Sequence, residues 1–305
     1  MMVSPVVPVG LRGADWEVDF YSRPILEADG RKRWELLICS TPQLFGGRDL
    51  ATQRTHPFRF EKRCSAENVN SQWLREAFAE ALELAEREGH VSPSRLRCWR
   101  GSMRAMVQRA ADSLGLEVLP SRRCFALLDW LGERERDLYP SQEGYLAGPL
   151  APAPQPQRPT PLPWPEVVRG DHWSWAMLPL SALEEAPGWN MGFGALLPIP
   201  RNLSPDAGVP GIRLFSRKRG LAIAGWLAGL EPVRLEMEHG QLVLEAGLDD
   251  RWRLAKLPQS EASAASEAFS RARREAGGLQ FLSVQNVEGD TYFEGFWMLK
   301  DLPDG

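Results

Sequence analysis

A proline-rich segment near the middle of the chain constrains its fold more than any other feature. Between Gly148 and Pro165 it holds 8 of the 25 prolines in this 305-residue sequence. Proline fixes φ and lacks a backbone N–H, so the segment is predicted to be an extended, polyproline-like spacer. We therefore expect two domains, residues 14–145 and 170–302, joined by a linker at 146–169. A proline-rich ligand for a protein partner is the alternative interpretation.

Hydrophobic periodicity predicts an α/β domain in the first half of the chain. Asp29-Gly30 marks a hairpin, Ser65 is the expected helix N-cap, and Gly89 and Gly115 end helical patterns. The order strand, strand, strand, helix, strand, helix, strand, helix is that of ribonuclease-H-like domains, an analogy of fold that assigns no function. We expect strands at 16–25, 33–40, 57–63, 95–99 and 116–120, with helices at 65–89, 102–114 and 124–136.

The second half is predicted to be a mixed, β-rich α+β domain. A meander with clean alternation has His239-Gly240 and Asp249-Asp250 at its turns, and a helix capped by Ser260 follows it. The expected strands are 173–180, 191–199, 212–215, 233–238, 241–245, 251–256, 279–284 and 292–299, and the expected helices are 221–230 and 260–276.

Cysteine usage and hydropathy indicate where the protein works. The four cysteines are widely spaced and form no CxxC pair, which favours free, buried thiols in a reducing compartment; they are Cys39, Cys64, Cys98 and Cys124. No stretch approaches the roughly 20 apolar residues of a membrane span. We expect a cytoplasmic protein without membrane insertion.

A metal-dependent nuclease is one hypothesis that the fold analogy raises. Ribonuclease-H-like hydrolysis needs carboxylates on the first strand, first helix and fourth strand to hold divalent metal ions. Asp19 is placed for the first, but the fourth strand, Arg95 to Arg100, carries arginines and no acid. Asp19 is therefore expected to pair with an arginine such as Arg23. Because histidine, glycine-rich and nucleophile motifs are also missing, we predict no enzyme, no cofactor and no metal site.

Positive charge is concentrated in one segment of a chain whose net charge is -4. Residues 94–124 hold seven arginines against two acids. Arginine grips phosphates bidentately, and a neighbouring tryptophan stacks unpaired bases. The alternative is a solvated face whose arginines pair with acids such as Glu133. The predicted RNA-binding residues of this segment are Arg97, Trp99, Arg100, Arg104, Arg122 and Arg123, and Arg217–Arg219 and Arg271–Arg274 would extend the basic track.

Several ordered strings lie along the chain outside the proline-rich segment. They are Trp16-Glu-Val-Asp-Phe-Tyr-Ser-Arg-Pro24, Trp34-Glu-Leu-Leu-Ile-Cys39, Phe58-Arg-Phe-Glu-Lys62, Val69-Asn-Ser-Gln-Trp-Leu-Arg-Glu76, Pro120-Ser-Arg-Arg-Cys-Phe-Ala-Leu-Leu-Asp-Trp130, Glu133-Arg-Glu-Arg-Asp-Leu-Tyr-Pro140 and Phe293-Glu-Gly-Phe-Trp-Met-Leu299. Together these strings resemble the Tab-type family, that of a green-algal chloroplast RNA-binding factor needed for translation of a photosystem I mRNA. The resemblance covers nearly the whole chain outside the proline-rich segment.

The resemblance implies binding of A/U-rich single-stranded leader RNA and a role in photosystem biogenesis, in a cyanobacterial-type cytoplasm. The family's Trp-Leu-Leu tripeptide, associated with RNA binding, falls on Trp297, Met298 and Leu299. The middle residue departs from the pattern but conserves volume and apolarity. Because Trp297 and Leu299 share one face of a strand, the alternative is that the tripeptide belongs to the core.

The sequence therefore predicts a non-enzymatic protein that binds single-stranded RNA and promotes translation of photosystem mRNAs. Two alternatives remain open at this point. One is an assembly scaffold that meets translation or photosystem assembly proteins through its tryptophans and proline-rich segment. The other is the metal-dependent nuclease.

Overall fold

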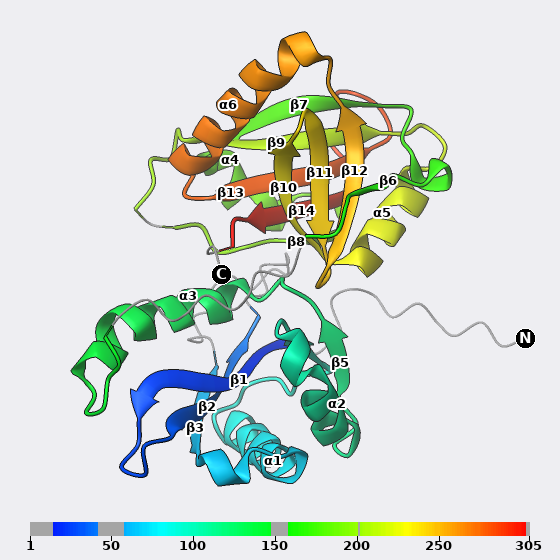
Figure 1. The fold of residues 1–305 in the computed structure, drawn as a ribbon. Coiled ribbons are helices and arrows are strands. Elements are labelled where there is room, and N and C mark those ends of the chain that lie inside the picture. Colours follow the sequence, from blue (N-terminus) through cyan, green and yellow to red (C-terminus); the bar gives the residue numbers. More distant parts are fainter. Residues whose placement is uncertain (1–14, 42–57, 148–157, 201, 303–305) are drawn as a thin grey trace, which may run out of the picture. The chain divides into compact units, whose positions relative to one another are not determined.

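The computed structural model describes residues 15–41, 58–147, 158–200 and 202–302, and its contacts divide the chain into two compact units. Unit 1 comprises the described residues up to 147, and unit 2 comprises 158–301 without residue 201 (Figure 1). The α+β class and two-domain organisation are thereby confirmed.

Part of the expected linker is packed into unit 2. Residues 148–157 lie outside the described residues, but β6 (Leu162–Pro163) pairs with strand β12 (Asp250–Lys256), and Trp164 is only 6% exposed. Prolines are tolerated here because β6 is an edge strand, where their missing N–H groups break no ladder. The end of the proline-rich segment is thus part of the fold of unit 2.

Unit 1 is a five-stranded sheet whose strands lie in the order β3-β2-β1-β4-β5. Strand β2 is antiparallel to both β1 and β3, whereas β1, β4 and β5 run parallel to one another. The predicted order of elements is confirmed: β1 (Asp15–Leu26), β2 (Lys32–Ser40), β3 (Arg59–Cys64), α1 (Ser71–Arg87), β4 (Arg95–Cys98), α2 (Arg104–Asp112), β5 (Glu117–Pro120) and α3 (Phe125–Glu133).

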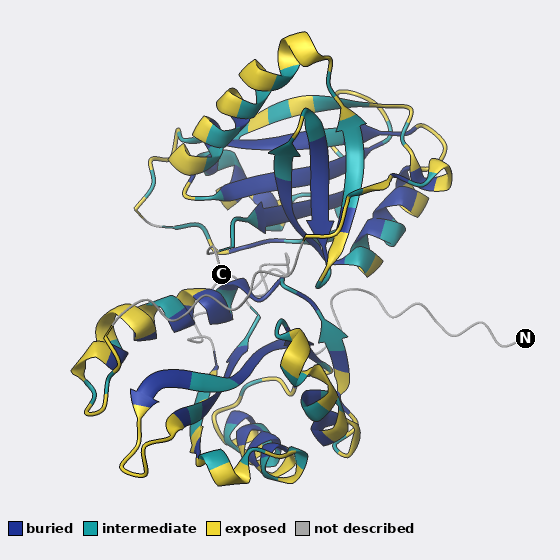
Figure 2. Ribbon diagram, viewed as in Figure 1, coloured by how far each residue is buried: buried dark blue, intermediate teal, exposed yellow. Residues whose placement is uncertain are grey.

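Strand β1 has an apolar face and a charged face, and both are buried (Figure 2). Trp16, Val18 and Phe20 pack in the core with α1 and α2. The alternate residues Asp15, Glu17 and Asp19 point to the opposite face, whose apolar part is covered by side chains of α3. The first strand therefore carries a row of carboxylates inside the protein.

The start of α1 differs from the sequence-based expectation. Ala66–Asn68 form a separate 3-10 turn, and the helix cap is Asn70 instead of Ser65. The Asn70 Oδ1 atom accepts hydrogen bonds from the backbone N–H groups of Gln72 and Trp73, at 3.0 and 2.9 Å.

Unit 2 contains two sheets that share one core. A five-stranded sheet has the order β7-β9-β13-β14-β8, and a four-stranded sheet has the order β10-β11-β12-β6. Side chains of both sheets pack together with residues of α5 and α6. The remaining elements are β7 (His172–Pro179), α4 (Leu180–Glu184), β8 (Met191–Ala195), β9 (Gly208–Phe215), α5 (Gly220–Leu230), β10 (Pro232–Glu238), β11 (Gln241–Ala246), α6 (Gln259–Glu275), β13 (Leu279–Gln285) and β14 (Phe293–Lys300).

In unit 2 the predicted turn at His239-Gly240 is confirmed, and the predicted cap of α6 is wrong. His239 and Gly240 have φ values of 49° and 73°, the positive φ pair of a type I′ hairpin turn between β10 and β11. Helix α6 begins one residue earlier than expected, after Pro258, and no side chain caps it. Ser260 is therefore not its cap.

The four cysteines are free and buried, as the sequence predicts. Burial raises the pKa of the Cys64 and Cys98 thiols to about 11, so they are neutral at physiological pH. Among the described residues, no helix is long and apolar enough to cross a bilayer.

Candidate nucleic-acid interface

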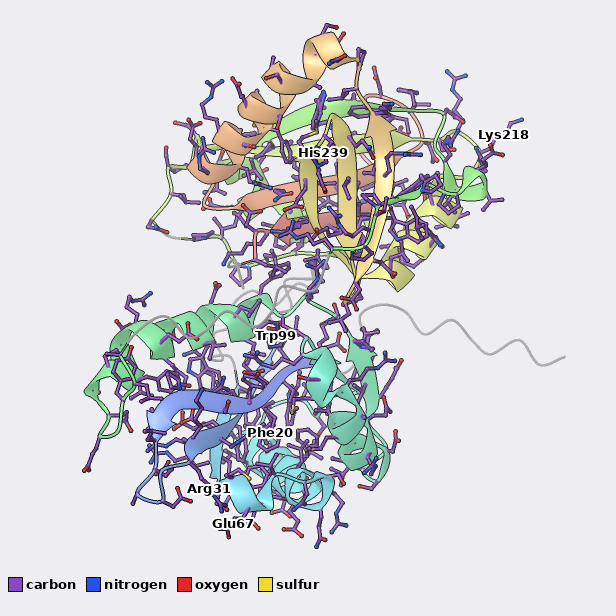
Figure 3. All side chains as sticks on the ribbon, in the orientation of Figure 1. Phe20, Arg31, Glu67, Trp99, Lys218 and His239 are labelled. Carbon is purple, nitrogen blue, oxygen red and sulfur yellow. The ribbon has the colours of Figure 1, made fainter. Side chains whose placement is uncertain are left out.

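The basic residues predicted in unit 1 gather at the carboxyl ends of two parallel strands. Cys98 at the end of β4 lies opposite Pro120 at the end of β5. Trp99-Arg100 and Arg122-Arg123 therefore leave the sheet side by side. Figure 3 places Trp99 at this end of unit 1.

The buried Asp19 carboxylate accepts hydrogen bonds from Trp99 and Arg100 of this patch. The Asp19 side chain is fully buried, and its Oδ2 atom accepts a hydrogen bond from Arg23 at 2.8 Å. Its Oδ1 atom accepts from Nε of Arg100 at 2.5 Å and from Nε1 of Trp99 at 3.1 Å. Burial by itself would raise the pKa of Asp19, but Arg23 and Arg100 outweigh it and hold the pKa below its ordinary value.

These contacts decide the role of Asp19. Both Asp19 oxygens accept hydrogen bonds from arginine or tryptophan N–H groups. The predicted pairing with Arg23 is one of these contacts. In the part of the chain that the structure describes, no three His, Cys, Asp or Glu side chains are grouped to hold a metal ion. The position at which a ribonuclease-H-like enzyme would need a metal ligand instead holds a carboxylate neutralised by guanidinium groups.

Arg100 lies between two aromatic rings. Its guanidinium carbon is 4.0 Å from the centre of the Tyr21 ring and 4.2 Å from that of Trp99. The Arg100 side chain is 20% exposed, and both rings are partly exposed. We call this arrangement the Tyr21–Arg100–Trp99 stack. It presents flat, cationic and aromatic surface of the kind that stacks on unpaired bases, and Asp19 fixes its orientation.

Arg97 and Arg123 belong to the buried network more than to the surface. Arg97 is 6% exposed and pairs with Asp15 at 2.8 Å, and Arg123 is 4% exposed. Burial raises the pKa of Glu17 to about 7, an effect that the Leu127 backbone N–H and these two arginines oppose. The sequence did not reveal these acidic partners because they lie more than about 80 residues earlier, on strand β1 beside β4.

Arg104 is the most accessible of the predicted arginines, and Arg122 is more accessible than Arg97 and Arg123. Arg104 is the first residue of α2 and is exposed, and Arg122 is half-buried. The predicted site thus separates into a buried part, Arg97 and Arg123, and an accessible part, the stack with Arg104 and Arg122.

The C-terminal tripeptide lies in the core of unit 2. Trp297, Met298 and Leu299 are 3%, 0% and 0% exposed on strand β14, which lies between β13 and β8. The Met298 sulfur accepts a hydrogen bond from the Leu197 backbone N–H at 3.4 Å. These side chains can meet RNA only if the strand leaves the sheet, so the structure supports the core alternative.

Unit 2 carries a basic loop, which the sequence predicted only as an extension of the basic track in residues 94–124. Arg217, Lys218 and Arg219 connect β9 to α5, and all three are exposed. Figure 3 shows Lys218 projecting from the periphery of unit 2. The sequence signal was a run of three basic residues between a strand and a helix.

Comparisons with known proteins cover both units. Residues 15–134 match the model of the N-terminal domain of the RNA-binding protein Tab2/Atab2, and residues 151–300 match that of its C-terminal domain. The chain is 35% identical over 298 residues to a chloroplastic TAB2 homologue of Zea mays, which covers 95% of this chain and 72% of the relative.

A chloroplastic TAB2 homologue of Arabidopsis thaliana is 30% identical over 298 residues, which is 95% of this chain and 75% of the relative. A solved structure of a simian T-cell lymphotropic virus intasome with the PP2A regulatory subunit B56 gamma is similar at 12% identity. It covers 82% of this chain and 84% of that one, but its TM-score of 0.22 carries no inference. The matches over both units, together with the two relatives, show that the chain belongs to the Tab2/Atab2 family of RNA-binding proteins.

Proposed function

We propose that the protein binds A/U-rich single-stranded leader RNA and thereby promotes translation of photosystem mRNAs, without catalysing a reaction. The observation that carries the proposal is the match of both units to RNA-binding domain models. The site of action is the cytoplasm of a cyanobacterial-type cell.

The accessible part of the unit 1 patch supports single-stranded RNA as the ligand. The Tyr21–Arg100–Trp99 stack offers two partly exposed aromatic residues that hold a guanidinium group between them, and Arg104 lies nearby in sequence at the start of α2. Unpaired bases stack on such surfaces, whereas the bases of a duplex are already stacked on one another. Net charge of -4 favours local contacts over general coating of RNA.

Binding of labelled oligonucleotides to the purified full chain tests the proposal. We expect an A/U-rich single strand to bind more tightly than a duplex of the same length, with affinity that falls as salt rises because phosphate contacts release counterions. Equal binding of duplex and single strand, or no binding at low salt, would contradict it. Cleavage of the oligonucleotide on addition of magnesium would instead favour the nuclease.

A matched pair of variants at Trp99 tests the stack. Trp99→Phe and Trp99→Leu both remove the N–H that donates to Asp19, so they differ mainly in the presence of a ring. We expect Trp99→Leu to weaken RNA binding about fivefold or more relative to Trp99→Phe, because base stacking on an aromatic ring is lost. Equal affinities of the two folded variants would remove Trp99 from the interface.

The translational role has a separate test in a photosynthetic host that depends on this protein. Without it, we expect ribosome occupancy of photosystem mRNAs to fall while the amounts of those mRNAs change little. Unchanged occupancy with defective photosystem assembly would favour the scaffold alternative.

A further inference from the structure

An open crevice lies at the carboxyl ends of two parallel strands in unit 2. Strands β9 and β13 are neighbours, and Phe215 is opposite Gln285 at their last pair. The chain segments that follow leave the sheet together and border a crevice of about 610 Å³, within the size range of small-ligand sites. In open α/β sheets, ligands commonly bind outside the carboxyl ends of the parallel strands. The crevice is lined by Asp171, His172, Arg217, Asn286, Val287 and Glu288.

Two glycines allow the three lining segments to approach each other. A Cβ on Gly170 would lie 2.7 Å from the Phe215 carbonyl oxygen, at the point where the Asp171 N–H donates to that oxygen. A Cβ on Gly220 would lie 2.6 Å from the Asn286 Oδ1 atom. The first contact is with a backbone atom, so the close approach of residues 170 and 215 depends on glycine. The second is with a side-chain atom, so a larger residue at 220 would displace the Asn286 amide.

One wall of the crevice is an aromatic platform. The His172 ring stacks on Phe215 with centroids 4.7 Å apart and an interplanar angle of 20°. Phe215 is 1% exposed, whereas the His172 side chain is 54% exposed. Phe215 therefore backs one face of the imidazole ring, and the exposed part of the ring is available to stack a base.

The polar lining suits a base edge better than a bare phosphate. Asp171 and Glu288 are acceptors, and both carry negative charge that would repel a phosphate in the crevice itself. One Asp171 oxygen accepts the Arg217 backbone N–H at 2.9 Å, and Asn286 donates to Glu294 at 2.7 Å, which fixes the Asn286 amide. Carboxylate and amide groups of this kind pair with the amino groups and ring nitrogens of a nucleobase.

Hydrogen-bonding capacity is also unused at the ends of the two strands. Ser216 and Gln285 immediately precede two of the lining residues and are 0% and 2% exposed. Among the described residues, the Ser216 hydroxyl and the side-chain amide oxygen of Gln285 have no hydrogen-bond partner. Because buried polar groups are ordinarily satisfied, these two groups set the ends of β9 and β13 apart from the rest of the sheet.

Positive charge lies at the rim. The side chains of Arg217, Lys218 and Arg169 are exposed, and within the described ranges none of them forms an ion pair or side-chain hydrogen bond. Arg219 differs, since it donates to the backbone carbonyl groups of Glu166, Val167 and Arg169 and so secures the loop. The phosphates of a nucleotide in the crevice would find unneutralised cations only at this rim.

We propose that this crevice binds one nucleotide of single-stranded RNA, with the base against His172 and the flanking phosphates on Arg217 and Lys218. The inference rests on the proposed RNA-binding function and assigns unit 2 its own point of contact with the strand. It requires no role for Trp297, Met298 or Leu299 beyond building the sheet that holds the crevice.

A pair of charge-matched variants tests the rim. Arg217→Gln/Lys218→Gln and the control Arg253→Gln/Lys256→Gln each remove two positive charges from unit 2, so they change net charge equally. We expect the first to weaken binding of an A/U-rich single strand about tenfold and to reduce the salt slope by about 1.4, two phosphate contacts at about 0.7 each. The control should change both quantities much less. Equal effects of the two double variants would overturn the proposal.

The platform has its own test, which salt does not affect. His172→Ala is expected to weaken binding about fivefold or more at every salt concentration, and His172→Phe to restore most of it, because the ring is kept. Equal affinities of wild type and His172→Ala would exclude stacking here. Thermal unfolding of each variant excludes loss of fold as the cause.

Photocross-linking of 4-thiouridine RNA to the full chain locates the contact directly. Cross-links in residues 169–172, 217–218 or 286–288 support the crevice, and cross-links confined to unit 1 overturn it while leaving RNA binding intact. If the wild-type chain binds no RNA at all, the proposed function itself fails.

Discussion

The two basic clusters of this protein differ in what surrounds their charges. The cluster of residues 94–124 in unit 1 is dense in arginine, yet Arg97 and Arg100 are paired with carboxylates of β1. The loop at 217–219 in unit 2 has only three basic residues, but within the described chain the side chains of Arg217 and Lys218 make no ion pair. The denser cluster has the smaller share of its charge available to a ligand.

The difference follows from burial. In unit 1 the carboxylates lie inside the sheet, where an unpaired charge is costly, so arginines from β4 and its carboxyl end must neutralise them. In unit 2 the basic loop is exposed to water, which solvates its charges without any protein partner. Local density of arginine in a sequence therefore measures the need for neutralisation as well as capacity for phosphate binding.

The largest expected effect is a loss of stability on breaking the Arg100–Asp19 pair in unit 1. Arg100→Ala leaves the buried Asp19 carboxylate with one guanidinium fewer and should lower the free energy of unfolding by about 3–5 kcal/mol. Arg217→Ala should leave the free energy of unfolding nearly unchanged, because it is an exposed substitution away from the core. Denaturant unfolding of both variants measures the contrast. Equal free energies of unfolding for the two variants would show that the two clusters are alike. Arg100→Lys keeps the charge and should lose less free energy of unfolding than Arg100→Ala.

A similar loss of stability is expected from a substitution on the buried strand β14 of unit 2. Trp297→Ala removes a core side chain and should lower the free energy of unfolding by about 3–5 kcal/mol. Its RNA binding should fall only with the fraction of unfolded protein, unlike that of the Arg217→Gln/Lys218→Gln variant. Measurement of both quantities at several temperatures separates the two cases. A stable Trp297→Phe variant that binds RNA weakly would return Trp297 to the interface.

A smaller effect concerns the pH dependence of the unit 1 network. The pKa of Glu17 is about 7 in the folded protein and 4.5 as an ordinary glutamate, so the folded state binds the extra proton between these values. Its contribution to stability is therefore complete at low pH and is lost as pH rises from about 4.5 to 7, by up to about 3 kcal/mol. Glu17→Gln should abolish this loss. Urea unfolding at pH 5 and pH 8 measures it, and an unchanged pH slope in the variant would exclude Glu17.

Local sequence patterns predicted most of the elements because their signals are short-range. Alternation in β1, the helical stripe of α1 and the His239-Gly240 turn each depend on neighbouring residues, and each was found. The Ser65 cap was wrong because an alternative cap, Asn70, lies only five residues further on. The expected spacer is packed into unit 2 at residues 162–164, because proline is compatible with an edge strand.

The site was predicted less well because partners far apart in sequence define it. Trp99 and Arg100 were predicted to bind RNA, but their contact with Asp19 spans about 80 residues and depends on β4 lying beside β1. The crevice in unit 2 brings together residues near positions 171, 217 and 287, which no local pattern links.

The sequence by itself determined the family, the two α+β domains and the order of their elements, since these follow from ordered strings and hydrophobic period. Only the tertiary structure decided which arginines are neutralised, that Trp297 is core, and that a crevice with free cations at its rim lies in unit 2. The physical reason is that charge availability depends on burial and on neighbouring strands, and both are set by how the sheets assemble.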